Sequence, residues 1–256
     1  MSQTELYTLQ SLTSPTAFFE PTSNAQSLKL LRAIQSADTV HDPSPPSKAY
    51  VTYSTPNIHE LSTLYSHLRT VEEPTSKLFG HDLWFDFINV DAGLLERRLP
   101  SWVVSEGVVV MAVQLLPIFG ALFVKSGSRG VIVVQRVSGA EAVKRWKAEA
   151  GRKGTVVAAS SKGPEEAVVI RHYAAKELGE EMISATGAGD NLAGAMLAAL
   201  VRGLRVSVPE ELDLIVELGQ RWVVERDGAW LRVEADLVAE FRSAACNTLR
   251  SPEAVG

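Results

Sequence analysis

The sequence contains a single cysteine, Cys246, among its 256 residues. One cysteine excludes an internal disulfide and any cysteine-rich metal site, because each of these needs a second thiol. A small apolar position on a helix accounts for Cys246 better than a catalytic nucleophile does. The chemistry of this protein must therefore be sought among its other residue types.

Positive charge is also in short supply. The chain has 25 lysines and arginines against 30 aspartates and glutamates, which gives a formal net charge of −5. A protein that binds nucleic acid carries a basic excess or a basic stripe. The only feature of that kind is a scatter of Lys and Arg between residues 137 and 165, for which a solvated face is the simpler interpretation. We therefore expect no nucleic-acid partner.

Long uninterrupted apolar runs are missing as well. The longest apolar stretch, residues 103–124, is broken by polar side chains, Pro117 and Gly120, whereas a membrane span needs about 18 or more clean apolar residues. Residues 1–12 are polar and lack the basic segment and apolar run of a signal peptide. We expect a soluble, cytoplasmic protein without a membrane partner, in which residues 103–124 form a buried helix followed by a strand.

Apolar residues make up 46% of the chain, which is enough for a sizeable core. Short runs rich in β-branched and aromatic residues alternate along the chain with amphipathic segments, and this alternation predicts an α/β fold. We expect strands near residues 17–20, 49–53, 121–125, 130–134 and 166–173, and helices near residues 24–34, 57–68, 77–98, 190–204, 209–225 and 234–247.

Two connections carry their own predictions. Residues 126–129 form a short glycine-containing link between two strand-like runs, which indicates a β-hairpin. The Lys-, Ala- and Gly-rich stretch over residues 137–165 is interpreted as a surface insertion.

A glycine-containing turn before an apolar helix is the most informative local feature. Gly187 and Gly189 flank Ala188, so their backbone amides and the positive end of the helix dipole can face an anion. Asp190 follows in the first helical turn, where a carboxylate can accept a proton from a hydroxyl during phosphoryl transfer. Asp is also favoured near helix N-termini for purely structural reasons. The small apolar residues at 193–199 favour close packing behind the turn, and hence a site.

Three segments together carry a resemblance to a known family. Residues 185–190, Ala-Thr-Gly-Ala-Gly-Asp, followed by Ala-Gly-Ala at 193–195, resemble the C-terminal signature of the ribokinase-like (PfkB) carbohydrate and nucleoside kinases. Residues 55–60, Thr-Pro-Asn-Ile-His-Glu, resemble the strand-to-helix turn of that family with its Asn-x-x-Glu element. Residues 124–131 resemble its nucleotide-binding hairpin with Gly-x-x-Gly. The three matches occur in the order that the family requires.

The resemblance implies a three-layer ribokinase-like α/β fold, with a mainly parallel sheet flanked by helices, and an ATP-dependent kinase that phosphorylates a sugar or nucleoside hydroxyl. It implies ATP and Mg²⁺ as cofactors. The implied roles are the base for Asp190, the anion hole for Gly187, Ala188 and Gly189, nucleotide binding for Lys125, Ser126, Gly127, Gly130 and Thr186, and Mg²⁺ binding, directly or through water, for Asn57 and Glu60. The last pair also fits a helix-capping box, and both roles can hold at once.

A finer resemblance concerns the acceptor. Residues 19–23 and 248–255 are similar to segments of pseudouridine kinases, which in fungi and some other eukaryotes are fused to a pseudouridine-5′-phosphate glycosidase. The resemblance therefore implies pseudouridine as the acceptor.

Three departures from the family pattern qualify these expectations. Residues 183–185, Ile-Ser-Ala, lack the acid that often precedes the signature, so the resemblance gives no support to a monovalent-cation site. Lys125 occupies a position where the family usually has a small hydroxyl residue. The match begins near Phe18, so residues 1–14 are interpreted as a polar tail and residues 15–256 as the ATP-side part of a kinase domain.

The substrate-binding half of the family, with its Gly-Gly element, has no counterpart in this sequence. Three hypotheses follow: a dimer or a partner supplies the missing half, the chain is an incomplete gene model, or it is a non-catalytic nucleotide-binding remnant.

Overall fold

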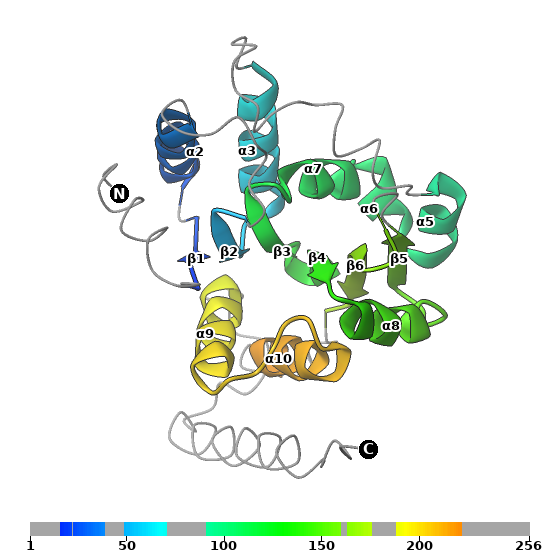
Figure 1. The fold of residues 1–256 in the computed structure, drawn as a ribbon. Helices are drawn as coiled ribbons and strands as arrows, with labels where there is room; N and C mark the ends of the chain where they lie inside the picture. The colour runs from blue at the N-terminus through cyan, green and yellow to red at the C-terminus, as the bar shows by residue number, and fades with distance from the viewer. Residues whose placement is uncertain are drawn as a thin grey trace. The chain divides into compact units, whose positions relative to one another are not determined.

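Six strands form one mixed sheet in the computed structural model (Figure 1), in the order β1-β2-β3-β4-β6-β5. The strands are β1 (Phe18–Phe19), β2 (Val51–Ser54), β3 (Phe119–Lys125), β4 (Val131–Ser138), β5 (Thr155–Ala159) and β6 (Glu166–Tyr173). The expected α/β sheet flanked by helices is confirmed, and so is each of the five strand segments predicted from the sequence.

The structure describes residues 16–21, 23–38, 49–70, 91–159, 163–175 and 188–221. The chain divides into two units, Met1–Ala174 and Ala175–Gly256, which we describe separately. The predicted tail at residues 1–14, the predicted helix at residues 234–247 and Cys246 lie outside the described residues.

The parallel part of the sheet comprises β1, β2 and β3. Helix α2 (Asn24–Asp38) connects β1 to β2, and helix α3 (Ile58–Thr70) begins the connection from β2 to β3. The Ser23 hydroxyl accepts a hydrogen bond from the Gln26 amide at 3.3 Å and so acts as the N-cap of α2. Because the three strands are parallel, their carboxyl ends lie at one edge of the sheet.

The remaining pairings, β3 with β4, β4 with β6 and β6 with β5, are antiparallel. Only short connections join β3 to β4 and β5 to β6, too short for a parallel crossover, whereas the connection from β4 to β5 contains a helix. The predicted hairpin is confirmed: β3 pairs with β4, and Lys125 lies opposite Val131 across the turn. The sheet is therefore mixed, and its parallel pairings are confined to β1, β2 and β3.

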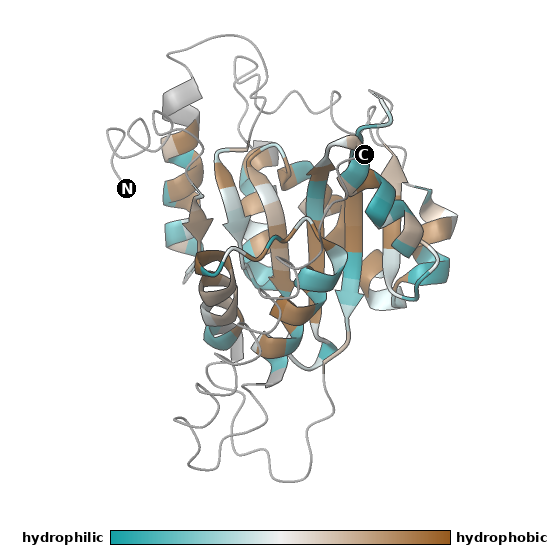
Figure 2. Ribbon diagram, turned by 60° about the horizontal axis from the view of Figure 1, so that its bottom comes forward, coloured by the Kyte–Doolittle hydropathy of each residue, from teal (hydrophilic) through white to brown (hydrophobic). Residues whose placement is uncertain are grey.

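One face of the sheet packs against α2, α3 and three further helices, α5 (Ala92–Arg98), α6 (Ser101–Ser105) and α7 (Val108–Leu115). Figure 2 shows the apolar residues, in brown, concentrated on the central strands and the helix faces that cover them. The expectation for residues 103–124 is confirmed, since they form buried helical turns and then β3. Among the described residues, no helix is long and apolar enough to cross a membrane.

The other face of β4, β5 and β6 is covered by helix α8 (Ala140–Glu149) (Figure 1). The structure differs here from the expected surface insertion at residues 137–165, because this stretch supplies both α8 and the edge strand β5. Val143 and Trp146 are fully buried, and the Arg171 guanidinium lies 5.7 Å from the Trp146 ring centroid. The lysines of α8 obscured this role, because they occupy only its solvent side.

The second unit contains two described helices, α9 (Ala188–Val201) and α10 (Pro209–Arg221). A Cβ added at Gly219 of α10 would lie 2.8 Å from Leu192 Cδ1 and 3.0 Å from its Cα. The two helices are therefore in contact at Gly219 and leave no room for a side chain. Of the small residues of α9, Ala193, Ala195 and Ala199 are buried, whereas Gly194 and Ala198 are exposed, so the predicted close packing holds for one face of the helix.

The burial of Trp146 gives a direct test of the role of α8. Trp146→Ala should lower the free energy of unfolding by about 3–5 kcal/mol, since it empties a fully buried indole site. Lys147→Ala, the adjacent exposed position on the same helix, should change it by less than about 0.5 kcal/mol. Urea titration followed by circular dichroism measures both, and equal small effects would restore the interpretation as a solvated insertion.

Candidate functional site

Polar residues collect where the three parallel strands end. Glu20 follows β1, Thr55 and Asn57 follow β2, and Lys125 is the last residue of β3. In open α/β sheets, ligands bind in the crevice outside the carboxyl ends of the strands. This edge is therefore where a binding site is expected on the topology alone.

Asn57 and Glu60 form a reciprocal pair at the start of α3. The Asn57 amide donates to Glu60 Oε2 at 2.8 Å, and the Glu60 amide donates to Asn57 Oδ1 at 2.9 Å. This is the capping box that the sequence predicted as one of two roles. Glu60 is buried, with a relative exposure of 7%. The Mg²⁺ role of the pair stays a prediction.

The turn after β2 is joined directly to the end of β3. The Lys125 amide donates to the Pro56 carbonyl at 2.8 Å, and Asn57 and Lys125 form an isolated parallel bridge. The two segments that resemble the magnesium-organising turn and the nucleotide hairpin, distant in sequence, are thus immediate neighbours.

An ion pair spans the same edge of the sheet. Lys125 Nζ lies 2.5 Å from Glu20 Oε1, and the two side chains are 15% and 22% exposed. The pair joins the ends of β1 and β3 across β2. Sequence reasoning singled out Lys125 but gave Glu20 no role; the available signal was an acid directly after a strand that pairs in parallel with its neighbour.

Three hydroxyl groups are buried at this edge without a hydrogen-bond partner among the described residues: those of Ser54, Thr55 and Ser126. A buried polar group without a partner costs about 1–3 kcal/mol, so such groups in a folded protein call for a specific explanation. The three oxygens have almost no solvent-accessible surface, so a ligand could reach them only after a local rearrangement. Ser54 and Thr55 were missed from sequence, where hydroxyl residues before a proline indicate only a turn.

The loop between β3 and β4 includes one short 3₁₀ turn, η2 (Gly127–Arg129). Gly127 and Gly130 adopt φ of +56° and +96°, a region that residues with a Cβ rarely enter. The Ser126 amide donates to the Gly130 carbonyl at 2.9 Å and closes the loop. Among the described residues, the Gly127 and Ser128 amides have no acceptor, and both residues are exposed. These free amides can hydrogen-bond an anion.

Asp190 lies in the first turn of α9, as the sequence predicted, and is exposed. Ala188 and Gly189 are the first two residues of that helix, whereas Thr186 and Gly187 lie outside the described residues. The structure therefore brings together the candidate residues of the first unit, while Asp190 belongs to the second unit. Among the described residues, no group of three or more His, Cys, Asp or Glu side chains is arranged to hold a metal ion.

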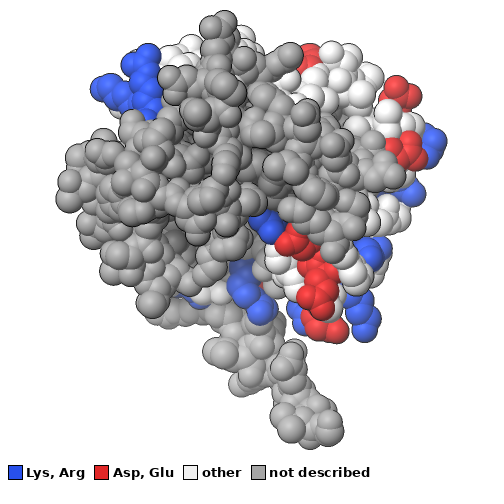
Figure 3. All heavy atoms as spheres, turned by 45° about the horizontal axis from the view of Figure 1, so that its top comes forward, with Lys and Arg blue, Asp and Glu red and all other residues white. Residues whose placement is uncertain are grey.

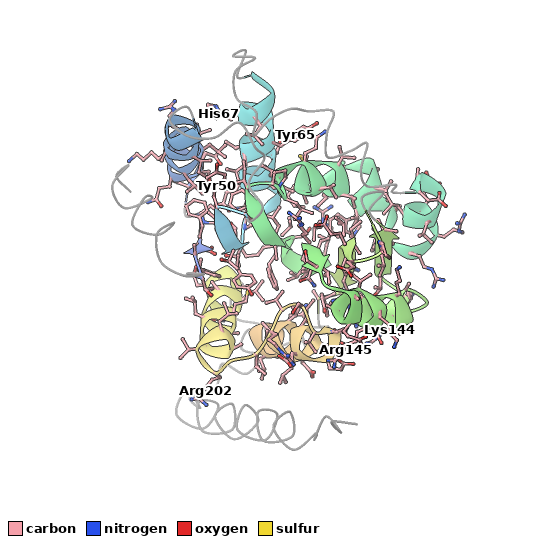
Figure 4. The ribbon with its side chains drawn as sticks, in the orientation of Figure 1. Tyr50, Tyr65, His67, Lys144, Arg145 and Arg202 are labelled. Carbon is pink, nitrogen blue, oxygen red and sulfur yellow. The ribbon has the colours of Figure 1, made fainter. Side chains whose placement is uncertain are left out.

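Charged side chains of both signs lie on the described part of the surface. Figure 3 shows lysine and arginine side chains interspersed with aspartate and glutamate on the right of this face, and a basic group alone at its upper left. Lys144 and Arg145, labelled in Figure 4, are exposed on α8 and not at the strand ends. Tyr65 and His67, also labelled, lie in the second half of α3, away from the Asn57–Glu60 cap at its start.

Comparison with known proteins finds a likeness among solved structures. No protein-family model matches the chain, and no curated protein does. Among solved structures, the chain is similar to the ribokinase from Cryptococcus neoformans var. grubii serotype A in complex with ADP, with a TM-score of 0.46 and 15% sequence identity. The likeness covers 94% of this chain, which spans 57% of the length of that ribokinase. A likeness this distant does not identify the activity of the present chain.

The positive φ of Gly127 predicts that a residue with a Cβ at this position lowers the stability of the protein. Gly127→Ala should lower the free energy of unfolding by about 1–2 kcal/mol, because a Cβ is disfavoured at φ of +56°. The added methyl meets no atom within 4 Å, so the cost is conformational. Gly151→Ala is the matched control, since that glycine is equally open and lacks a positive φ. Chemical denaturation of the two variants compares them, and a cost of the same size in both would contradict the conformational explanation.

Proposed function

We propose that this protein is an ATP-dependent kinase of the ribokinase-like type, which phosphorylates a hydroxyl group of a sugar or nucleoside, with pseudouridine as the acceptor. The observation that carries the proposal is the direct contact between residues 55–57 and Lys125 at the carboxyl ends of adjacent parallel strands. The family resemblance implies Mg²⁺ binding for the first segment and nucleotide binding for the second, and in a kinase these two functions belong to one site. Their proximity supports that common assignment.

The nucleotide phosphates would lie against the end of β3 and the hairpin loop. Lys125 contributes a compact positive charge with three donors, so its ammonium can stay on Glu20 and still reach a phosphate oxygen. The free Gly127 and Ser128 amides border the nucleotide from the loop.

The Asn57–Glu60 pair suits Mg²⁺ by the chemistry of its donor set. Asn57 Oδ1 and the Glu60 carboxylate are hard oxygen donors, the kind that Mg²⁺ takes directly or through retained waters. The capping bonds use one acceptor site on each side chain and leave further lone pairs. Mg²⁺ bound there would neutralise charge on the phosphates. The Glu20–Lys125 pair would orient the phosphate chain independently of the metal.

Asp190 is the base of the proposed transfer step. Its carboxylate accepts the proton of the acceptor hydroxyl as the acceptor oxygen forms a bond to the γ-phosphorus of ATP. The bond between that phosphorus and the β,γ-bridging oxygen breaks, and ADP leaves. The amides of Gly187, Ala188 and Gly189, at the N-terminus of α9, would hold the charge that spreads over the transferring phosphoryl oxygens.

Replacement of Asp190 should affect the rate of phosphoryl transfer and leave ATP binding unchanged. Asp190→Asn should lower kcat for transfer to pseudouridine, ribose or adenosine by roughly 100-fold to 10,000-fold, because the amide cannot accept the proton. ATP affinity should stay close to that of the wild type. Glu210→Gln is the matched control, because Glu210 is an exposed acid in the first turn of α10. A coupled ADP-release assay measures the rates, and a kcat preserved in Asp190→Asn would overturn the assignment.

The two roles of Glu60 can be separated by an isosteric change. Glu60→Gln keeps an oxygen for the Asn57 amide, so the free energy of unfolding should change by less than about 0.5 kcal/mol. The Mg²⁺ concentration needed for half-maximal activity should rise roughly tenfold to a hundredfold. Asn57→Ala, which removes the cap acceptor, should cost about 1 kcal/mol of stability. An unchanged Mg²⁺ requirement in Glu60→Gln would leave Glu60 as a cap alone.

A second candidate is a nucleotide-binding protein without transferase activity. Asp190 lies in the first turn of α9, and Glu210 and Glu211 lie in the first turn of α10, where no catalytic motif is present. An acid at such a position therefore needs no catalytic role, and this favours the second candidate. In that case wild type and Asp190→Asn would bind ATP equally and neither would transfer phosphate.

A further inference from the structure

Arg129 makes three contacts with groups outside its own loop. Its guanidinium lies 4.1 Å from the Trp102 ring centroid, and its two terminal nitrogens pair with the two carboxylate oxygens of Glu106, the second at 3.1 Å. Its main-chain carbonyl lies 2.9 Å from His172 Nε2. Arg129 is therefore held through both its side chain and its backbone.

The three contact residues are themselves fixed to rigid elements. Trp102 lies within α6, Glu106 is the C-cap of that helix, and His172 pairs with Ile132 in the sheet. The Trp102 and His172 rings also meet edge to face, with centroids 5.8 Å apart. Donation from Arg129 lowers the pKa of Glu106, so the carboxylate stays charged at neutral pH.

The loop that Arg129 belongs to needs such an anchor. Gly127 and Gly130 give it access to positive φ, but glycine also leaves a chain more conformations to lose on ordering. Ser128 and Gly127 are exposed and make no amide hydrogen bond among the described residues. The anchor at Arg129 thus adds to the backbone hydrogen bonds that close the loop, while the Gly127 and Ser128 amides face solvent.

We propose that Arg129, clamped by Trp102, Glu106 and His172, is a positioning residue that holds the hairpin loop in the conformation that binds nucleotide. The proposal rests on the function proposed above, because it takes the loop as the border of the nucleotide site. Arg129 itself touches no ligand in this account. It lowers the entropy that the loop loses when its amides engage a phosphate or ribose oxygen.

A positioning role differs from a structural one in what its loss changes. Exposed ion pairs and cation–π contacts contribute little to global stability, and both Arg129 and Glu106 are more than a third exposed. Loss of the clamp should therefore leave the melting temperature almost unchanged. It should weaken nucleotide binding, because a looser loop must be ordered by the ligand.

The test compares Arg129→Met with Arg129→Lys, and uses Arg152→Met as a control. Arg152 is an exposed arginine whose ion pair, with Glu149 at 3.2 Å, is distant in sequence from the hairpin loop. In Arg129→Met the KM for ATP and the calorimetric Kd for ADP should rise about tenfold, or about 1.4 kcal/mol, with kcat within about twofold of wild type. Amide hydrogen exchange over residues 126–130 should accelerate, while the melting temperature matches that of Arg152→Met.

Arg129→Lys should recover part of the affinity, because lysine keeps the charge over Trp102 and one bond to Glu106 but loses the planar fork. Unchanged ADP affinity and unchanged exchange in Arg129→Met would overturn the proposal, and so would an equal loss in Arg152→Met. If the wild type binds no ADP and transfers no phosphate, the proposed function fails. The exchange rates then still decide whether Arg129 orders the loop.

Discussion

The parallel pairing of β2 with β3 is the constraint on which the rest of the candidate site depends. It brings the turn after β2 against the last residue of β3, where the Lys125 amide donates to the Pro56 carbonyl. Because of this contact, Asn57 and Lys125 are neighbours. The Lys125 side chain then reaches Glu20 on the far side of β2. A strand register shifted by one residue would send Lys125 to the opposite face of the sheet.

The same edge concentrates features that are unfavourable for stability alone. It has a partly buried ion pair, three buried hydroxyls without partners among the described residues, and two glycines at positive φ. Each costs free energy that the apolar core beneath α2, α3 and α7 must offset. Such departures from an optimal fold are expected where a protein binds a ligand, because binding groups must be left incompletely satisfied.

Sequence reasoning was most successful where the signal was local. The hairpin between β3 and β4 and the capping box at Asn57 each depend on residues a few positions apart, and both are confirmed. It was wrong about the solvation of residues 137–165, because the lysines of α8 are visible in sequence but the burial of Trp146 is not. Val143 and Trp146 lie three residues apart on one face of α8, so the helix is amphipathic, but the interpretation gave more weight to the charged residues around them.

The sequence by itself determined most of the strands and helices and the turn chemistry, because propensity and capping act within a few residues. A resemblance, and not local propensity, supplied the residues that are proposed to bind phosphate and Mg²⁺. Only the tertiary structure decided that Glu20 is the partner of Lys125, that Ser54 and Thr55 join the candidate site, and that Arg129 is anchored to α6 and β6. These contacts join residues distant in sequence. Their existence depends on strand order and register, which no local pattern specifies.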